Sequence, residues 1–223
     1  MMIHDSFRLS RIGRLAPAFL LPLVLVGCAA PGFLLDAFMP PDRIPAAYTP
    51  ADRTTVVFVD DPGNVLPQSS LRATLVAAVR HNLTQEEVIT TFVAGNRLAT
   101  ARLNEPDFSD WPIDRVGRHV EAEQVLYIRV EQFQSSEPTK TETYRPRAIV
   151  RVKLIDVETG QRLFPARDDY GTRVTTTMFF RTQQESRGTA AVLAQTLAQK
   201  TGEDVARLFY RHEPRAVGSG WDD

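Results

Sequence analysis

The sequence predicts an α+β fold, a two-layer sandwich in which helices cover one face of a mixed, mostly antiparallel sheet. Two segments, 125–133 and 147–157, alternate apolar with charged residues, which is the period of a half-buried strand. Two others, 71–83 and 189–211, repeat apolar residues at helical spacing. Because the strands have one apolar and one charged face, we expect helices on the apolar face and water on the other.

The expected order of elements is β-α-β-α-β-β-β-α. The β-branched and aromatic run at 54–59 predicts a buried first strand, and turn-forming residues at 60–64 end it. A helix then begins at Ser69 or Ser70, whose hydroxyl groups suit the N-cap position. Residues 88–93 predict a short second strand, and a polar stretch follows it.

The second half of the domain begins with a helix capped by Asp110. The two alternating strands come next, and a tight turn after the second of them places Gly160 where a positive φ is easily adopted. The return strand is expected in two pieces, 162–164 and 170–180, because Pro165 interrupts it. The long C-terminal helix completes the sandwich.

The first 27 residues have the layout of a secretory signal peptide. Arg8, Arg11 and Arg14 form a positive region, and an apolar run at 15–26 follows. Twelve residues rise only about 18 Å as a helix, against a hydrocarbon core of about 30 Å. The segment therefore fits a cleaved signal peptide, 1–27, better than a membrane span.

The residues at the end of this segment resemble the lipobox of bacterial lipoproteins. Leu25, Val26 and Gly27 match the positions that the signal peptidase recognises, and Cys28 matches the lipidated cysteine that becomes the first mature residue. Cys28 is the only cysteine, so no disulfide can form within the chain. Ala29 stands where some bacteria use aspartate to retain lipoproteins in the inner membrane. We therefore expect palmitate-type lipidation and an outer-membrane anchor facing the periplasm.

Composition divides the mature chain into three parts. Residues 28–52 form a proline-rich tether, 53–213 form one globular domain, and 214–223 form a flexible tail. The net charge of the whole chain is −1. This argues against general nucleic-acid binding, which needs an electropositive surface.

Basic residues on the charged sides of the two alternating strands are the candidate partner-binding face. They are Arg129 on the first strand and Arg147, Arg151 and Lys153 on the second. One interpretation is a patch for an acidic partner or an anionic glycan. The alternative is the solvated face of an antiparallel sheet, balanced by acidic residues on neighbouring strands.

No catalytic motif stands out. Asp60 and Asp61 end the first strand, where paired carboxylates could hold a divalent cation, and this is the alternative hypothesis of an envelope enzyme or metal-binding domain. His81, His119 and His212 lack the spacing of a metal pair. We predict no catalytic residue, no metal ligand and no cofactor.

The pattern of the domain resembles a family of envelope lipoproteins with an anticodon-binding-like α/β domain. This family includes the lipoprotein activators of penicillin-binding proteins and the curli-secretion lipoprotein. The resemblance rests on the strand at 125–130, the strand and turn at 151–161, and the lipobox with its tether. It implies a nonenzymatic binding or assembly module, held at the membrane by the lipid on Cys28, whose partner is another envelope protein or a cell-wall component rather than a small-molecule substrate.

Overall fold

The computed structural model describes residues 43–135, 145–178 and 190–214. The chain divides into two compact units, Met1–Pro41 and Asp42–Asp223, and every described residue belongs to the second. The predicted signal peptide and the predicted lipobox around Cys28 lie outside the described residues. Within the described ranges, no helix combines the length and the hydropathy that crossing a bilayer requires.

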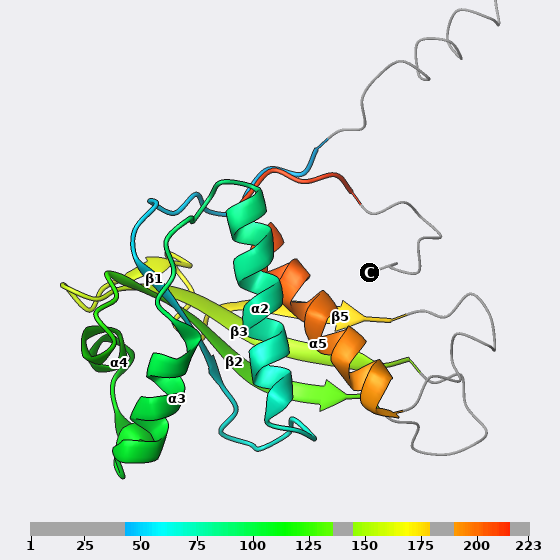
Figure 1. The fold of residues 1–223 in the computed structure, drawn as a ribbon. Helices are drawn as coiled ribbons and strands as arrows, with labels where there is room; N and C mark the ends of the chain where they lie inside the picture. The colour runs from blue at the N-terminus through cyan, green and yellow to red at the C-terminus, as the bar shows by residue number, and fades with distance from the viewer. Residues whose placement is uncertain (1–42, 136–144, 179–189, 215–223) are drawn as a thin grey trace, which may run out of the picture. The chain divides into compact units, whose positions relative to one another are not determined.

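Five strands form one mixed sheet (Figure 1). In chain order they are β1 (Thr55–Asp60), β2 (Gln124–Gln134), β3 (Arg147–Asp156), β4 (Arg162–Phe164) and β5 (Thr172–Thr177). β1 runs parallel to β2, and β2 runs antiparallel to β3. β4 and β5 both pair antiparallel with the other edge of β3. The return strand therefore comes in two pieces, as predicted.

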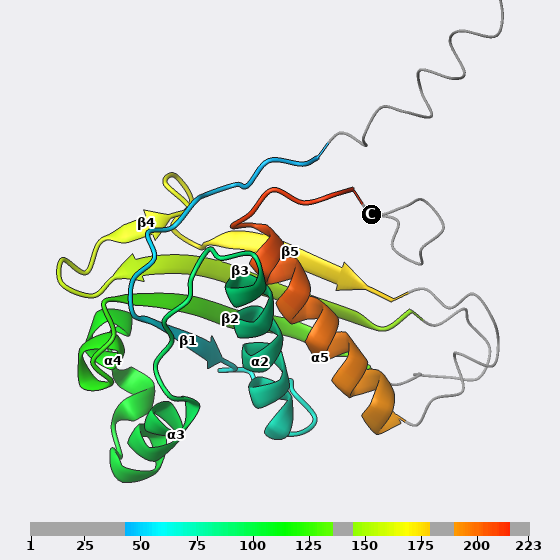
Figure 2. The same cartoon turned by 45° about the horizontal axis from the view of Figure 1, so that its top comes forward.

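Two long helices cover one face of the sheet, α2 (Ser70–Gln85) and α5 (Ala190–Arg207) (Figure 2). The predicted apolar stripe of α2 is confirmed, since all four of its residues are buried: Leu71, Leu75, Val79 and Leu83. A Cβ atom added to Gly202 of α5 would lie 2.7 Å from the Cβ of Ala78 and 2.7 Å from the carbonyl oxygen of Leu75. Gly202 thus allows the two helices to cross in close contact.

The other face of the sheet is covered at its β1 end, which the sequence did not predict. Three short helices lie between β1 and β2 in the chain: α3 (Gly95–Asn104), the 3₁₀ helix η1 (Phe108–Asp110) and α4 (Ile113–His119). Their segment buries a second apolar cluster against Phe58 and Tyr127 of the sheet. The expected charged, open face therefore begins only beyond this cluster, on β3, β5 and the second half of β2.

The predicted second strand and polar stretch also differ from the structure. Residues 88–93 contribute a single parallel bridge, between Phe92 and Thr55, because the chain turns into α3 directly afterwards. α3 buries only Ala101. A helix with so narrow an apolar stripe leaves little periodic signal in the sequence.

Candidate functional site

A row of three arginines crosses the sheet on the face opposite α2 and α5. Arg129 of β2 lies beside Arg151 of β3, and Arg151 lies beside Arg173 of β5. Val150 and Val152, which flank Arg151 along β3, are fully buried in the core beneath the helices. Because side chains alternate along a strand, the arginines point to the other side.

The structure places all four sequence-predicted basic residues on this face. Lys153 follows Arg151 two positions along β3, and Arg147 lies at the start of β3 beside Thr177 of β5. Sequence reasoning missed Arg173, although the Thr-Arg-Val-Thr-Thr-Thr segment of β5 alternates as the other strands do. We define the basic face by five residues: Arg129, Arg147, Arg151, Lys153 and Arg173.

Arg151 is the anchored member of the basic face. Its Nε atom lies 3.1 Å from a carboxylate oxygen of Glu131, and its Nη1 atom donates to the carbonyl oxygen of Gly171 at 3.1 Å. The same nitrogen lies 3.7 Å from a carboxylate oxygen of Asp168. The side chain is only 26% exposed. Arg151 is therefore held by its neighbours and contributes less outward charge than the residues beside it.

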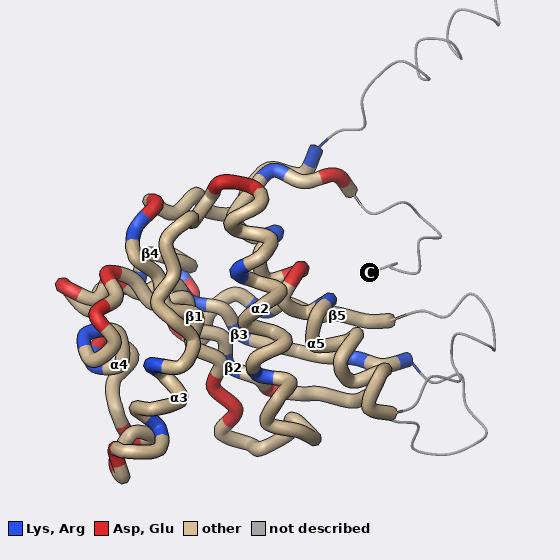
Figure 3. The backbone as a smooth tube through the Cα atoms, in the orientation of Figure 1, with Lys and Arg blue, Asp and Glu red and all other residues tan. Residues whose placement is uncertain are grey.

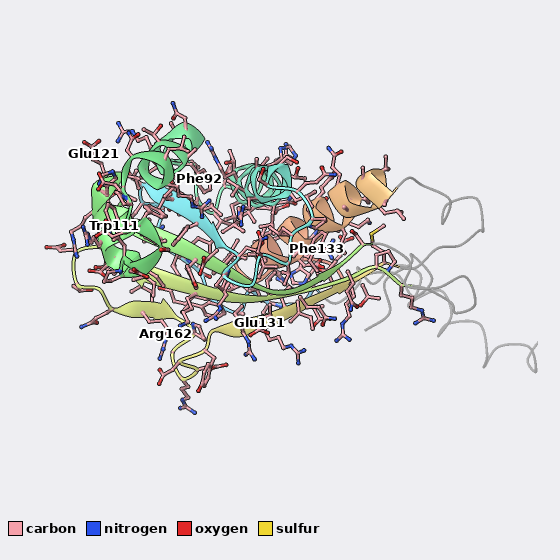
Figure 4. The ribbon with its side chains drawn as sticks, turned by 90° about the horizontal axis from the view of Figure 1, so that it is seen from below. Phe92, Trp111, Glu121, Glu131, Phe133 and Arg162 are labelled. Carbon is pink, nitrogen blue, oxygen red and sulfur yellow. The ribbon has the colours of Figure 1, made fainter. Side chains whose placement is uncertain are left out.

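The loop between β4 and β5 partly neutralises one end of the basic face. Arg162 pairs with Asp169 of this loop at 2.6 Å. Burial and the nearby Arg162 guanidinium lower the pKa of Lys153, while Asp169 opposes that change. Figure 4 shows Arg162 and Glu131 on the side of the sheet away from the long helices. Lys153 thus lies among fixed charges close to this loop.

The remaining three arginines supply the free charge of the basic face. Arg129, Arg147 and Arg173 are exposed, and within the described ranges none of them forms an ion pair. Around α4, by contrast, acidic and basic positions are mixed (Figure 3), and Arg115 and Arg118 both pair with aspartates. The unpaired arginines of the basic face therefore lie together on β2, β3 and β5.

The two carboxylates at the end of β1 have different hydrogen-bond partners. Asp61 turns back into its own loop, where it accepts hydrogen bonds from the backbone N–H groups of Val65 at 2.8 Å and Leu66 at 3.1 Å. Arg72 of α2 donates to the same carboxylate at 3.3 Å. The Asp61 side chain has no exposed surface. Its oxygens are used to close the loop between β1 and α2.

Asp60 shares the lining of a polar cavity of about 450 Å³ with Asp61, Arg72, Arg102 and Tyr127. It accepts a hydrogen bond from the Tyr127 hydroxyl group at 2.6 Å. Burial, with this bond and the Asp60 charge, raises the pKa of Tyr127 well above its usual range. Tyr127 is therefore a fixed donor that orients Asp60, and the pair has the geometry of a structural hydrogen bond.

The described part of the chain contains no group of three or more His, Cys, Asp or Glu side chains placed to hold a metal ion. Two of the three histidines named above, His119 and His212, lie beside aromatic rings. His119 lies 5.0 Å from the Trp111 ring centroid, and His212 lies 6.0 Å from that of Tyr210. Asp60 and Asp61 therefore each accept hydrogen bonds from different protein groups. The geometry supports binding at the basic face better than it supports a reaction at the end of β1.

No protein-family model matches the chain, and no curated protein matches it. Solved structures match at the level of the fold. PelC from Paraburkholderia phytofirmans, solved as a dodecamer, is 16% identical with a TM-score of 0.38, and the match covers 75% of this chain and 94% of that chain. Lipoprotein GNA1162 from Neisseria meningitidis is 12% identical with a TM-score of 0.42, covering 69% and 97%.

The C-terminal domain of LpoB from Salmonella enterica is a further match, 15% identical with a TM-score of 0.33, covering 59% of this chain and 86% of that chain. Of these three neighbours, GNA1162 is a lipoprotein by name. At such identities and TM-scores a likeness transfers no function, so the function is argued from the residues of this chain.

Proposed function

We propose that this chain is a lipid-anchored protein of the bacterial envelope that binds another envelope component through its basic face and catalyses no reaction itself. The observation that carries the proposal is the arginine row. Like charges directly opposite each other on neighbouring strands destabilise a sheet. Among the described residues, Glu131 and Asp168 form ion pairs with Arg151 and with no other member of the row. Arg129 and Arg173 therefore remain unbalanced, which suits the binding of an acidic partner.

The kind of partner follows from the shape and charge of the face. It is built on strands rather than in a cleft, so it suits a broad surface such as an acidic patch of an envelope protein. Exposed charges of this kind speed the encounter and set the orientation of a complex more than they add affinity. Binding should accordingly weaken as salt is raised, since salt screens exposed charges.

Lipidation of Cys28 is the second part of the proposal. Leu25, Val26 and Gly27 support it through their match to the lipobox, and Ala29 supports delivery to the outer membrane, with the domain in the periplasm. A single acyl chain anchors only weakly, so a stable anchor needs more than one. Cells grown with a fatty-acid analogue should label the wild-type chain and leave Cys28→Ala unlabelled. Equal labelling of the two would remove lipidation from the proposal.

The basic face is tested by reversing its two exposed row residues, Arg129→Glu with Arg173→Glu. Each new carboxylate lies beside Arg151, and opposite charges across strands contribute about 0.2–1 kcal/mol each, so the free energy of unfolding should hold or rise. Capture of envelope components from solubilised membranes should fall at least tenfold. Arg211→Glu, an exposed reversal just beyond α5, is the matched control. Capture that survives the double reversal in a folded protein would mean that this face is merely solvated.

A further inference from the structure

β1 has an open backbone edge. Thr55 uses its outward N–H and C=O groups to bond to Thr91 and Val93. In a parallel pair, alternate residues direct both backbone groups to the same side, so Val57 and Val59 also face outward. The guanidinium of Arg102 donates to the Val59 carbonyl oxygen at 2.6 Å. Among the described residues, none bonds to the outward groups of Val57 or to the Val59 N–H group.

This edge forms the floor of an apolar groove. α2 lies on one side of β1 and α3 on the other (Figure 2), and the cavity between them has a volume of about 810 Å³. That volume is in the range of ligand pockets in proteins. Ala73, Val76 and Ala77 of α2 form one wall, and Leu98 of α3 contributes to the other. The groove therefore offers apolar walls on both sides of a strand that has room for a neighbour.

The groove also carries positive charge without matching acidic residues. Arg72, Arg80 and Arg102 line it. Arg72 is bound to Asp61, but Arg80 and Arg102 form no ion pair within the described ranges. The guanidinium carbon of Arg80 lies 5.2 Å from the Phe92 ring centroid, and that of Arg102 lies 5.2 Å from the Phe58 ring centroid. Planar guanidinium groups held in this way favour carboxylates as ligands.

We propose that the groove binds an extended segment of a partner protein, which adds as a strand to the outer edge of β1. Its backbone bonds to both outward groups of Val57 and to the Val59 N–H group, its apolar side chains pack against α2 and α3, and a carboxylate lies near Arg80 or Arg102. This is recognition by strand addition, in which backbone bonds supply affinity and the walls supply specificity. The groove is a different surface from the basic face, so this inference does not depend on the proposed function.

Other occupants fit the groove less well. An acyl chain would fill the apolar walls but leave the outward N–H and C=O groups of Val57 without partners, which is unfavourable away from water. A second copy would have to insert an edge strand of its own. Its β1 is recessed between helices, and its β4–β5 edge is interrupted at 165–171. A single extended peptide meets both the backbone and the side-chain requirements.

The test uses the full mature chain in detergent and a phage-displayed library of random twelve-residue peptides. We expect enriched peptides that alternate apolar residues and carry an acidic residue. With one such peptide bound at saturation, amide hydrogen exchange at Val57 and Val59 should slow at least tenfold. Exchange at Val56 and Phe58 should not change, because these alternate residues already bond to β2. The amides of Val56 and Phe58 thus serve as an internal control for those of Val57 and Val59 in the same strand.

A groove variant gives the second readout. Ala77→Trp places a large side chain in the groove from an exposed position of α2, and it should weaken peptide binding at least tenfold. Gln85→Trp, also exposed on α2 but outside the groove lining, should bind within twofold of wild type. The proposal is overturned if no peptide is enriched, or if a bound peptide leaves the Val57 amide unprotected. Protection of Val57 that rises with protein concentration alone would point to a second copy and would also overturn it.

Discussion

The Asp61 carboxylate is the most consequential single group at the end of β1, and its removal has a calculable effect. Asp61→Ala deletes the acceptor of two backbone N–H groups, those of Val65 and Leu66, and of one guanidinium donor. Each buried donor left without an acceptor costs about 1–3 kcal/mol. Arg72 keeps 27% of its side chain exposed, so the lost ion pair costs less than the value of about 3–5 kcal/mol for a fully buried pair. We therefore expect the free energy of unfolding to fall by about 3–4 kcal/mol.

Urea unfolding followed by circular dichroism measures this loss, and Asp60→Asn is the matched control. The new amide oxygen of that variant still accepts from the Tyr127 hydroxyl group, so the change should stay below about 1 kcal/mol. The same three proteins test whether the carboxylates bind a cation. If they do, Mg²⁺ or Ca²⁺ should raise the melting temperature of the wild-type protein. A cation-dependent rise that both substitutions abolish, or an Asp61→Ala variant as stable as wild type, would refute the reasoning.

Three further outcomes follow from the fold. Gly202→Ala gains about 1 kcal/mol of helix propensity but forces a methyl group against the backbone of Leu75, so thermal unfolding should show a net loss of about 1–2 kcal/mol. Hydrogen bonds from Thr159 lower the pKa of Asp156 in the folded protein. The ionised Asp156 therefore contributes its full share to the free energy of unfolding above about pH 4, and this share is lost as the pH falls further. Asp156→Asn should make the free energy of unfolding depend less on pH in that range. Limited proteolysis should remove residues before the compact unit and stop near Asp42, because Ile44 bonds to His212 and Tyr48 packs against the core; a stop near residue 53 would support the shorter domain that the sequence predicts.

Side-chain periodicity predicts most of the helices and strands of the fold. The alternation along β2 and β3 and the apolar stripe of α2 each arise from one local period, so no knowledge of neighbours was needed. The break of the return strand at Pro165 was also local, because proline removes a backbone donor. α3 lacked such a signal, since one buried residue defines no stripe. The segment at 88–93 looked like a strand from its composition, yet only Phe92 found a pairing partner.

The basic face was predicted in part for the same reason. Alternation places Arg129, Arg151 and Lys153 away from the helices, but it does not say which residues become neighbours on adjacent strands. That depends on register, which here includes an irregularity between Val130 and Gln132. Glu131 falls at this irregularity and reaches Arg151. The row with Arg173 is therefore a property of pairing, and no single strand reveals it.

The open edge of β1 is a feature that the sequence pattern does not predict. Both faces of this strand are covered, since Val57 packs beneath α2 and Phe58 packs on the opposite cluster. A continuous apolar run with such burial is typical of a central strand, and composition alone reads it so. Side-chain burial and backbone pairing are nevertheless independent, because side chains leave a sheet above and below while hydrogen bonds leave it sideways. A strand can therefore have buried side chains on both faces and still have no paired strand along one of its two edges. In this chain, residues of α2 and α3 form the apolar walls beside that unpaired edge of β1.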